Sequence, residues 1–386
     1  MFQIKINTQL LKETVNLAKQ ATASTNVLPI LSTIKLKATE KALGISSSNS
    51  HVSLAQIVPA TDELTVLDTG EICIAIALFA KLVNNLPGEE TLLSESEHNR
   101  LAIESGPFKT TLAGKAGAEY PRFPDVDSKT QFELNKQDLL TLIESTAPFT
   151  AKEESRPILT GVHFVAKDGK LTATATDAHT MSRRSLTCDT TIQLDVVIPR
   201  ENLLKLVNLL KGTKTDTIII RYTNVGLQIV ADSRFIYLRS LEGAYPETDR
   251  LIPTEHEVEL TANTHLLKQA FKRAALISST IANEPVDLVI TKDNLTLSTQ
   301  TELNQTNEAL ALGTEDDETA TIKEITMPSL NELRISFNCS WIGLLLDHIH
   351  TETVKLGFTS PVRPVKIEGV GDEDYVQILT PIKTMR

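Results

Sequence analysis

The sequence predicts an α+β protein made of three tandem copies of one fold, with antiparallel sheets that carry their helices on one face. A short alternating strand leads into an amphipathic helix near residues 2–11, and the same pattern returns near 132–140 and 258–267. Each copy then continues with strands, a second helix and more strands. Helices and strands therefore do not alternate one for one, which disfavours a parallel α/β sheet.

Short sequence landmarks recur at domain-sized offsets. Pro-Ile-Leu at 29–31 returns at 157–159, Lys-Leu-Val-Asn at 81–84 returns at 205–208, and Tyr-Pro at 120–121 returns at 245–246. Offsets of 128, 124 and 125 residues indicate a repeated domain rather than a solenoid unit. The third copy has diverged most. Pro- and charge-bearing segments near 124–130 and 252–257 predict domains at 1–126, 127–254 and 255–386.

Two helices are expected in each copy. The predicted helices cover residues 10–21, 74–86, 136–147, 200–211, 263–278 and 339–350. The first helix of each copy follows a polar Asn or Thr, which can cap its free N–H groups. Alternating runs such as 162–165, 170–174 and 217–220 predict strands, and Lys-Asp-Gly or Asn-Val-Gly turns connect them.

Composition indicates a water-soluble, intracellular chain. The 386 residues are 41% hydrophobic and only 4% aromatic, so several mainly aliphatic cores are expected. We expect no export signal at the N-terminus, and no apolar run is long enough to cross a membrane. Cys73, Cys188 and Cys339 lie far apart with no metal-binding spacing, and we expect them to be buried thiols in a reducing cytoplasm.

Positive charge is concentrated in the predicted helices. They contain ten basic and five acidic residues, a net charge of +5. Because the formal net charge of the whole chain is −11, the rest of the chain carries −16. The helix at 263–278 has three basic residues and no acid. If the helices share one side of the assembly, that side suits duplex DNA. The alternative is that exposed helix faces simply carry lysine.

No catalytic or cofactor motif emerges. Residues 112–116 lack the first glycine and the hydroxyl residue of a phosphate-binding loop, and Gly369 and Gly371 are not followed by a third glycine and a helix. His348 and His350 face different sides of a helix, so we expect no metal. Asp177 and His179 offer an acid beside an imidazole, and an enzyme with a dispersed site around them is the main alternative function. A general scaffold built from the same repeat that no longer binds DNA is the second alternative.

The chain resembles the beta subunit of bacterial DNA polymerase III, the sliding clamp, over essentially its whole length. The most specific stretches are residues 156–164, 175–179, 245–253, 268–271, 337–338 and 364–368. The resemblance implies three copies of the DNA-clamp fold in each chain. Two chains would close head to tail into a ring, with sheets outside and helices inside around duplex DNA. It implies a processivity factor for DNA replication with no catalysis and no cofactor.

Three sets of site residues are expected, and the resemblance implies the second and third of them. The expected DNA-facing residues are Arg156 and the ten basic residues of the predicted helices: Lys12, Lys19, Lys81, Lys136, Arg200, Lys205, Lys211, Lys268, Lys272 and Arg273. The homodimer interface is expected to use Phe108 on one side and Leu276 and Ile277 on the other. The expected peptide-partner groove consists of Leu159, Thr176, His179, Met181, Pro246, Arg250, Leu251, Trp341, Pro364, Ile378, Leu379, Thr380, Pro381 and Ile382.

Partners follow from the same resemblance. We expect sequence-independent binding to duplex DNA, and docking of the polymerase III catalytic subunit and clamp-loader subunits through short Gln- and Leu-rich peptide motifs. The chain departs from the usual family pattern at three positions. Ala178 replaces a common Gly, Thr180 replaces a common Arg, and Thr25 stands where an Arg that touches DNA is often found.

Overall fold

A computed structural model describes residues 1–22, 28–126, 130–153, 155–189, 191–279, 284–313 and 320–383. Thr25 lies outside these residues. The described chain forms two compact units, and α3 (Lys136–Thr146) crosses from one to the other. Unit 1 comprises Met1–Thr141 and Leu194–Glu242, and unit 2 comprises Leu142–Gln193 and Gly243–Arg386. No helix among the described residues is both long and apolar enough to span a bilayer.

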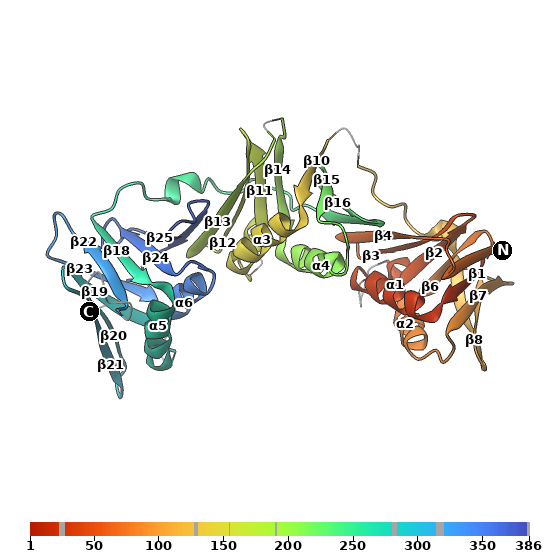
Figure 1. The fold of residues 1–386 in the computed structure, drawn as a ribbon, viewed down its shortest axis with the longest axis horizontal. Helices are drawn as coiled ribbons and strands as arrows, with labels where there is room; N and C mark the ends of the chain where they lie inside the picture. Colours follow the sequence, from red (N-terminus) through yellow and green to blue (C-terminus); the bar gives the residue numbers. More distant parts are fainter. Residues whose placement is uncertain are drawn as a thin grey trace. The chain divides into compact units, whose positions relative to one another are not determined.

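Unit 1 contains a long twisted sheet with three complete helices (Figure 1). Its helices are α1 (Thr8–Gln20), α2 (Ile76–Asn84) and α4 (Arg200–Leu210). The strands of this sheet are β1 (Gln3–Asn7), β2 (Thr33–Thr39), β3 (Ala42–Ser48), β4 (Val52–Pro59), β5 (Leu64–Asp68), β6 (Gly70–Ala75), β7 (Glu90–Ser96), β8 (Arg100–Ser105), β9 (Phe108–Ala116), β10 (Gln131–Asn135), β15 (Thr217–Thr223), β16 (Gly226–Ala231) and β17 (Arg234–Arg239). The remaining strand of unit 1, β14 (Leu194–Pro199), is not part of this sheet.

Unit 2 contains two sheets and the helices α5 (Thr264–Ser278) and α6 (Cys339–Asp347). Strands β11 (Gly161–Lys167), β12 (Lys170–Thr176), β13 (Thr180–Thr187), β26 (Tyr375–Leu379), β25 (Val365–Gly369), β24 (Thr353–Phe358), β18 (Val258–Asn263) and β22 (Ile322–Thr326) are neighbours in that order. The second sheet has the order β21 (Gln305–Ala311), β20 (Asn294–Gln300), β19 (Pro285–Thr291) and β23 (Glu332–Asn338).

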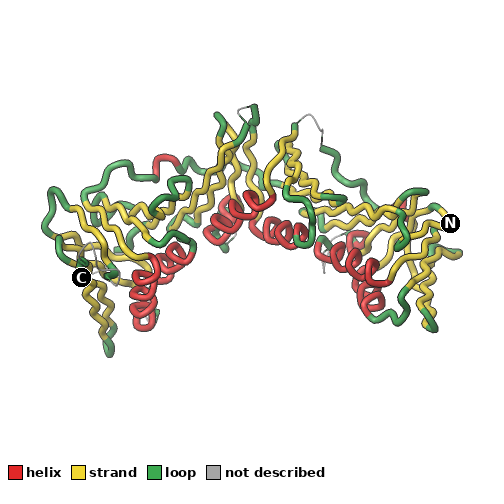
Figure 2. The backbone as a smooth tube through the Cα atoms, viewed as in Figure 1, coloured by secondary structure: helices red, strands yellow, loops and turns green. Residues whose placement is uncertain are grey.

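Both units confirm the predicted α+β class. Their strand ladders are antiparallel, and all six predicted helices form within three residues of the expected ends. Figure 2 shows α1 and α2 side by side on one face of the strands of unit 1, and α5 beside α6 in unit 2. The helices have apolar inner faces because residues spaced three or four apart, such as Leu11, Val15 and Ala18, are fully buried.

Asparagine caps begin the first helix of every copy. The side chain of Asn7 accepts hydrogen bonds from the N–H groups of α1, Asn135 accepts from α3, and Asn263 accepts from α5. In the third copy the sequence pattern predicts Thr261 as the cap, at the end of the repeated strand pattern, but the cap in the structure is Asn263. The three caps are therefore spaced by 128 residues twice, which makes them the most regular landmark of the repeat.

The cores are aliphatic, as expected from the composition. In unit 1, Phe2 and Phe79 are the large aromatics in a cluster of otherwise Ile, Leu, Val and Ala side chains. Cys73 and Cys339 are buried, and burial raises the pKa of each thiol to about 11. Cys188 is only half-buried, so the expectation of three buried thiols was wrong at this position.

Strand pairing joins segments that are far apart in the sequence. In unit 1, β4 pairs with β17, so Val52 lies opposite Leu238. In unit 2, β13 pairs with β26, so Thr180 lies opposite Leu379. Each pairing connects residues assigned to different copies of the repeat, which explains why the compact units do not follow the repeat boundaries.

His256 gives unit 2 a predicted pH dependence. Its half-buried ring lies against Gly357, and its Nδ1 is buried with no hydrogen-bond partner among the described residues. Desolvation lowers the pKa of His256 below 6.5, although Glu259 and Glu368 act in the opposite direction. Since the unfolded chain then takes up the proton first, this residue favours folding above pH 6.5, and that contribution falls as the pH drops toward the lowered pKa.

We therefore expect the free energy of unfolding to fall less between pH 7.5 and 5.5 in His256→Gln than in the original chain. Urea denaturation at both pH values measures this difference. His350→Gln, at an exposed position, is the matched control and should behave like the original chain. An equal pH-dependent loss in His256→Gln and the original chain would contradict the account.

Candidate functional site

Unit 2 contains a pocket of about 210 Å³ beside the pairing of β13 and β26, which we call the anchor pocket. Its floor is apolar because Leu159, Met181 and Ile378 are almost fully buried there. The lining residues are Arg156, Leu159, Thr176, Ala178, His179, Thr180, Met181, Pro246, Thr248, Leu251, Pro364, Ile378 and Thr380. An apolar concavity with a few polar groups at its rim suits an aliphatic side chain of a partner.

A tight turn between β12 and β13 forms one wall of the anchor pocket. One carboxylate oxygen of Asp177 accepts hydrogen bonds from the N–H groups of His179 and Thr180, at 2.9 and 2.7 Å, and from the Thr180 hydroxyl. The Thr176 hydroxyl accepts from the N–H of Ala178 and donates to the carbonyl of Thr180. These bonds fix the backbone on both sides of His179.

Ala178 adopts a left-handed conformation in this turn, with φ of 77°. Glycine reaches this conformation without steric cost, whereas a residue with a Cβ is strained there. The turn therefore keeps the shape that a glycine would give it, and its hydrogen bonds offset the strain of the alanine.

Trp341, the only tryptophan in the chain, stacks on His179. The ring centroids are 4.4 Å apart and the planes differ by 18°. Trp341 lies at the start of α6, where Asn338 caps the helix by accepting from the N–H of Trp341. His179 lines the pocket, whereas Trp341 packs against the face of the His179 ring and does not line the pocket.

The segment from 245 to 251 forms the opposite wall and is fastened by side chains. Tyr245 stacks on His163 with ring centroids 4.7 Å apart, and its hydroxyl accepts from the N–H of Thr176. Arg183 donates to the Thr248 hydroxyl at 2.6 Å and pairs with Asp249 at 2.7 Å. Burial raises the pKa of Tyr245, so this hydroxyl stays neutral and available for hydrogen bonding.

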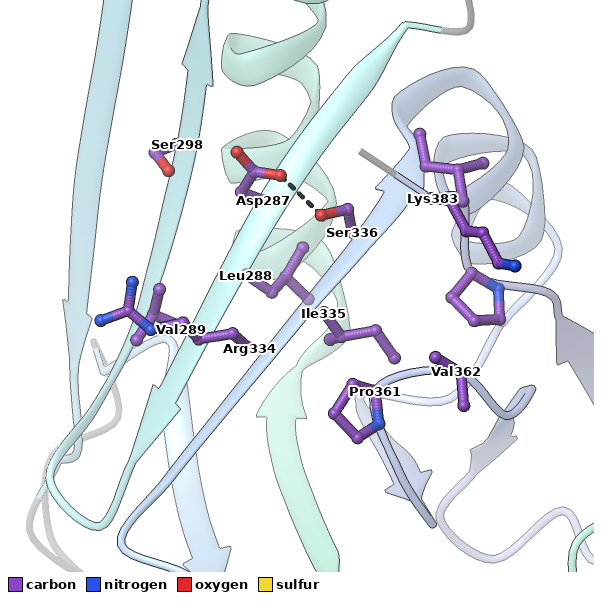
Figure 3. Close-up of a pocket in the computed structure, with 12 residues that line it drawn as sticks. Asp287, Leu288, Val289, Ser298, Arg334, Ile335, Ser336, Pro361, Val362 and Lys383 are labelled. Atoms are coloured by element: carbon purple, nitrogen blue, oxygen red, sulfur yellow. Dashed lines mark hydrogen bonds between the residues drawn. The ribbon is translucent and has the colours of Figure 1, made fainter. Parts of the chain in front are cut away.

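The C-terminal segment leaves the anchor pocket toward a larger cavity. The N–H of Thr380 donates to the carbonyl of His179, and the N–H of Ile382 donates to the carbonyl of Ser336 on β23. Pro381 and Ile382 line this second cavity of about 580 Å³, which we call the tail pocket. In Figure 3, Asp287 and Ser336 are hydrogen-bonded on the sheet, and Pro361, Val362 and Lys383 lie across the cavity from them.

Most of the expected groove residues lie together, but not all line one pocket. Nine of the fourteen line the anchor pocket: Leu159, Thr176, His179, Met181, Pro246, Leu251, Pro364, Ile378 and Thr380. Arg250 lines a neighbouring cavity with Leu251 and Pro364. Leu379 has no exposed surface, so it belongs to the core. The sequence did not point to Ala178, Thr180 or Thr248 as lining residues, and it assigned Arg156 to DNA.

The basic residues of the helices differ in how available their charges are. In α5, Lys268 pairs with Asp347, and Arg273 pairs with Glu308 through an Nε contact of 2.9 Å. Lys136 donates to the carbonyl of Thr213, Lys211 to Asn208, and Arg200 pairs with Glu201. Lys19, Lys81 and Lys272 are exposed, while Lys12 and Lys205 are half-buried, and none of these five forms an ion pair with a described residue.

The expected interface residues differ in exposure. Leu276 is 75% exposed on α5. Ile277 is half-buried, and Phe108 is half-buried at the start of β9, packed against the core of unit 1.

The geometry gives no support to chemistry at Asp177 and His179. The Asp177 carboxylate oxygen is occupied by three donors of its own turn, and the His179 ring is stacked on an indole. Within the described ranges, no group of three or more His, Cys, Asp or Glu side chains comes together in a way that could hold a metal ion.

Comparison with known proteins places the whole chain among polymerase subunits. Family models for the DNA polymerase III beta subunit match residues 2–124 with the N-terminal domain, 133–247 with the central domain and 249–383 with the C-terminal domain. The beta sliding clamp of Streptococcus pneumoniae strain R6 is 33% identical over 392 residues, covering 100% of both chains. That of Lactococcus lactis is 28% identical over 395 residues, again covering both chains completely.

Solved structures agree with this placement. The DNA polymerase III beta chain of Streptococcus pneumoniae TIGR4 has a TM-score of 0.91 at 32% identity and covers 100% of both chains. The DNA polymerase sliding clamp of Bacillus subtilis has a TM-score of 0.91 at 26% identity with the same coverage.

The stacked pair at the anchor pocket makes Trp341 a reporter of the site. Removing the imidazole in His179→Ala should uncover one face of the indole, so that the emission shifts to the red and acrylamide quenches it more strongly. Steady-state fluorescence of the chain measures both effects. His163→Ala, which removes an imidazole stacked on Tyr245 instead, should leave Trp341 emission unchanged. Unchanged emission in His179→Ala would show that the stack is absent in solution.

Proposed function

This chain belongs to the DNA polymerase III beta subunit family of sliding clamps, and we propose that it encircles duplex DNA as a ring-shaped processivity factor. In this role it performs no catalysis and tethers the replicative polymerase and other DNA-handling proteins to the template. The observation that carries the proposal is the match of three consecutive family models, which together span residues 2–383 almost without interruption. A bacterial replication factor of this kind works in the cytoplasm.

Three clamp domains, at 1–126, 127–254 and 255–386, are part of the proposal. The asparagine caps at intervals of 128 residues support this division, since each cap starts the first helix of a copy. Strand pairing between copies, as in β4 with β17, supports continuous sheets from one domain to the next.

The proposed contact with DNA uses the basic helix residues as flexible charges on phosphates. This mode of binding ignores sequence, because lysine on a helix face offers no paired donors to base edges. The ion pairs in α5 reduce the free charge there, which leaves Lys272 as its main available cation. Lys19 and Lys81 are the exposed counterparts in unit 1.

Reversing the charge in Lys272→Glu should weaken binding to any duplex and should lower the slope of log K against log salt by about 1, the value for one phosphate contact. Fluorescence anisotropy with two unrelated duplexes over a salt series measures both quantities. Lys167→Glu, at an exposed position on a strand, makes the same charge change away from the helices and serves as the control. Binding that stays unchanged in Lys272→Glu, or that prefers one sequence, would contradict the proposal.

A head-to-tail homodimer completes the proposed ring. Leu276 and Ile277 are adjacent near the end of α5, and the exposed Leu276 leaves an apolar side chain available to a second chain, which supports an interface there. In a heterologous contact this surface would meet a different one on the second chain, for which Phe108 is our candidate.

The double variant Leu276→Ala with Ile277→Ala should run as a monomer at micromolar concentration, because it removes the apolar side chains proposed for the interface. Light scattering after size exclusion gives the mass. Leu303→Ala, at a leucine that is 92% exposed elsewhere in unit 2, is the control and should remain dimeric. A double variant that is still dimeric would rule out this interface.

The anchor pocket is the proposed docking site for short partner peptides of the polymerase and clamp-loader subunits. Its buried floor and exposed rim support capture of one apolar side chain, with the tail segment 380–382 beside it. Extended segments lose much freedom on binding, so micromolar affinity is expected for a single peptide. Two sites in a dimer would add avidity for larger partners.

Truncation after Thr380 removes Pro381 and Ile382 but leaves β26 whole, including the buried Leu379. We expect it to weaken the binding of Gln- and Leu-rich peptides at least tenfold while the dimer and DNA binding persist. Titration of a labelled peptide measures the loss. Truncation after Lys383 is the control. Equal affinity in both truncations would place the site elsewhere.

A further inference from the structure

A third cavity of about 320 Å³ adjoins the anchor pocket, and we call it the arginine pocket. The two share Leu251 and Pro364 in their walls, so one extended segment can occupy both. The residues that line the arginine pocket are Arg250, Leu251, Ile252, Pro253, Thr254, Glu255, Thr359, Arg363 and Pro364.

The charge of this pocket comes from two exposed guanidinium groups. Arg363 forms no ion pair with any residue that the structure describes. Arg250 pairs with Glu247 at 3.2 Å, but both side chains are more than 70% exposed, and such surface pairs exchange readily. Glu255 is the single acid in the lining, and Glu247 offsets the charge of Arg250, so Arg363 is the cation that this pocket offers to a ligand.

The backbone around these arginines is fixed. The N–H of Arg363 donates to the carbonyl of Ser360, and Pro364 restrains the residue before it. The hydroxyl of Thr359 donates to the carbonyl of Glu255, which joins the two chain segments that form the pocket. These contacts hold the backbone from which the Arg363 side chain extends, and its planar guanidinium presents donors in a fixed fork.

We propose that the arginine pocket recognises an acidic side chain of the partner peptide, adjacent to the apolar residue that fills the anchor pocket. The inference rests on the proposed function of the anchor pocket and adds to it the chemistry of the flanking residue. A carboxylate fits because a planar guanidinium can donate two parallel hydrogen bonds to it. In a chain with a net charge of −11, the exposed Arg363 marks a position at which an acidic side chain is tolerated.

The test uses labelled peptides with one Gln- and Leu-rich core and a single Glu, Gln or Lys placed in turn at each flanking position. Anisotropy should identify a position at which Glu binds about two- to fivefold more tightly than Gln, the range for an exposed ion pair. Arg363→Gln should abolish this preference while the Gln peptide binds as before. Arg363→Glu should transfer the preference to the Lys peptide at the same position.

Arg334→Gln is the matched control, because Arg334 is an exposed arginine that lines the tail pocket instead. It should leave the preference for Glu intact. Equal weakening of the Glu and Gln peptides by Arg363→Gln, or no preference at any position, would overturn the inference. Displacement of the Glu peptide by a short single-stranded oligonucleotide in the original chain but not in Arg363→Gln would also overturn it, since the pocket would then be a phosphate site. If no peptide binds at all, the docking function of the anchor pocket itself fails, a result distinct from loss of the charge preference.

Discussion

The pairing of β13 with β26 is the interaction on which the candidate site depends. Five residue pairs, from Thr180 with Leu379 to Arg184 with Tyr375, join the middle of the chain to its C-terminal strand. A buried backbone donor or acceptor without a partner costs about 1–3 kcal/mol, so neither strand can leave this ladder without a large loss. The anchor pocket lies at the end of the ladder, where both strands contribute lining residues.

Buried polar side chains reinforce this pairing. The carbonyl of Ser145 accepts from the hydroxyls of Ser182 and Tyr375, at 2.6 and 3.1 Å. Gln377 donates to the carbonyl of Leu345 in α6 and to the Tyr375 hydroxyl. A connected network of this kind is stable only when its members keep their places, because an unmet partner in a core is costly. The network thus joins the two strands that supply Met181 and Ile378 to the floor of the pocket, whereas His179 and Leu251 at its rim are exposed.

Features set by local sequence could be predicted: helix positions followed from periodicity, and nine groove residues carried over from the resemblance lie around one pocket. Features set by pairing between distant segments could not be predicted. Leu379 looks like a groove residue in the sequence, but it is buried because Thr180 and Val365 face it from the two adjacent strands. Lys268 and Arg273 look free on a helix without acids, yet their partners Asp347 and Glu308 lie on other elements.

We infer that the assembled protein holds DNA by enclosing it, with phosphate contacts weak enough to let it move. The most direct measurement loads labelled protein onto a nicked circular plasmid with a bacterial clamp loader and ATP, removes free protein by gel filtration, and follows retention at high salt before and after a single restriction cut. The protein should stay on the circle and should be lost once the plasmid is linear, because only free ends allow a ring to escape. Equal retention on circular and linear DNA, or loss from both as salt rises, would contradict it.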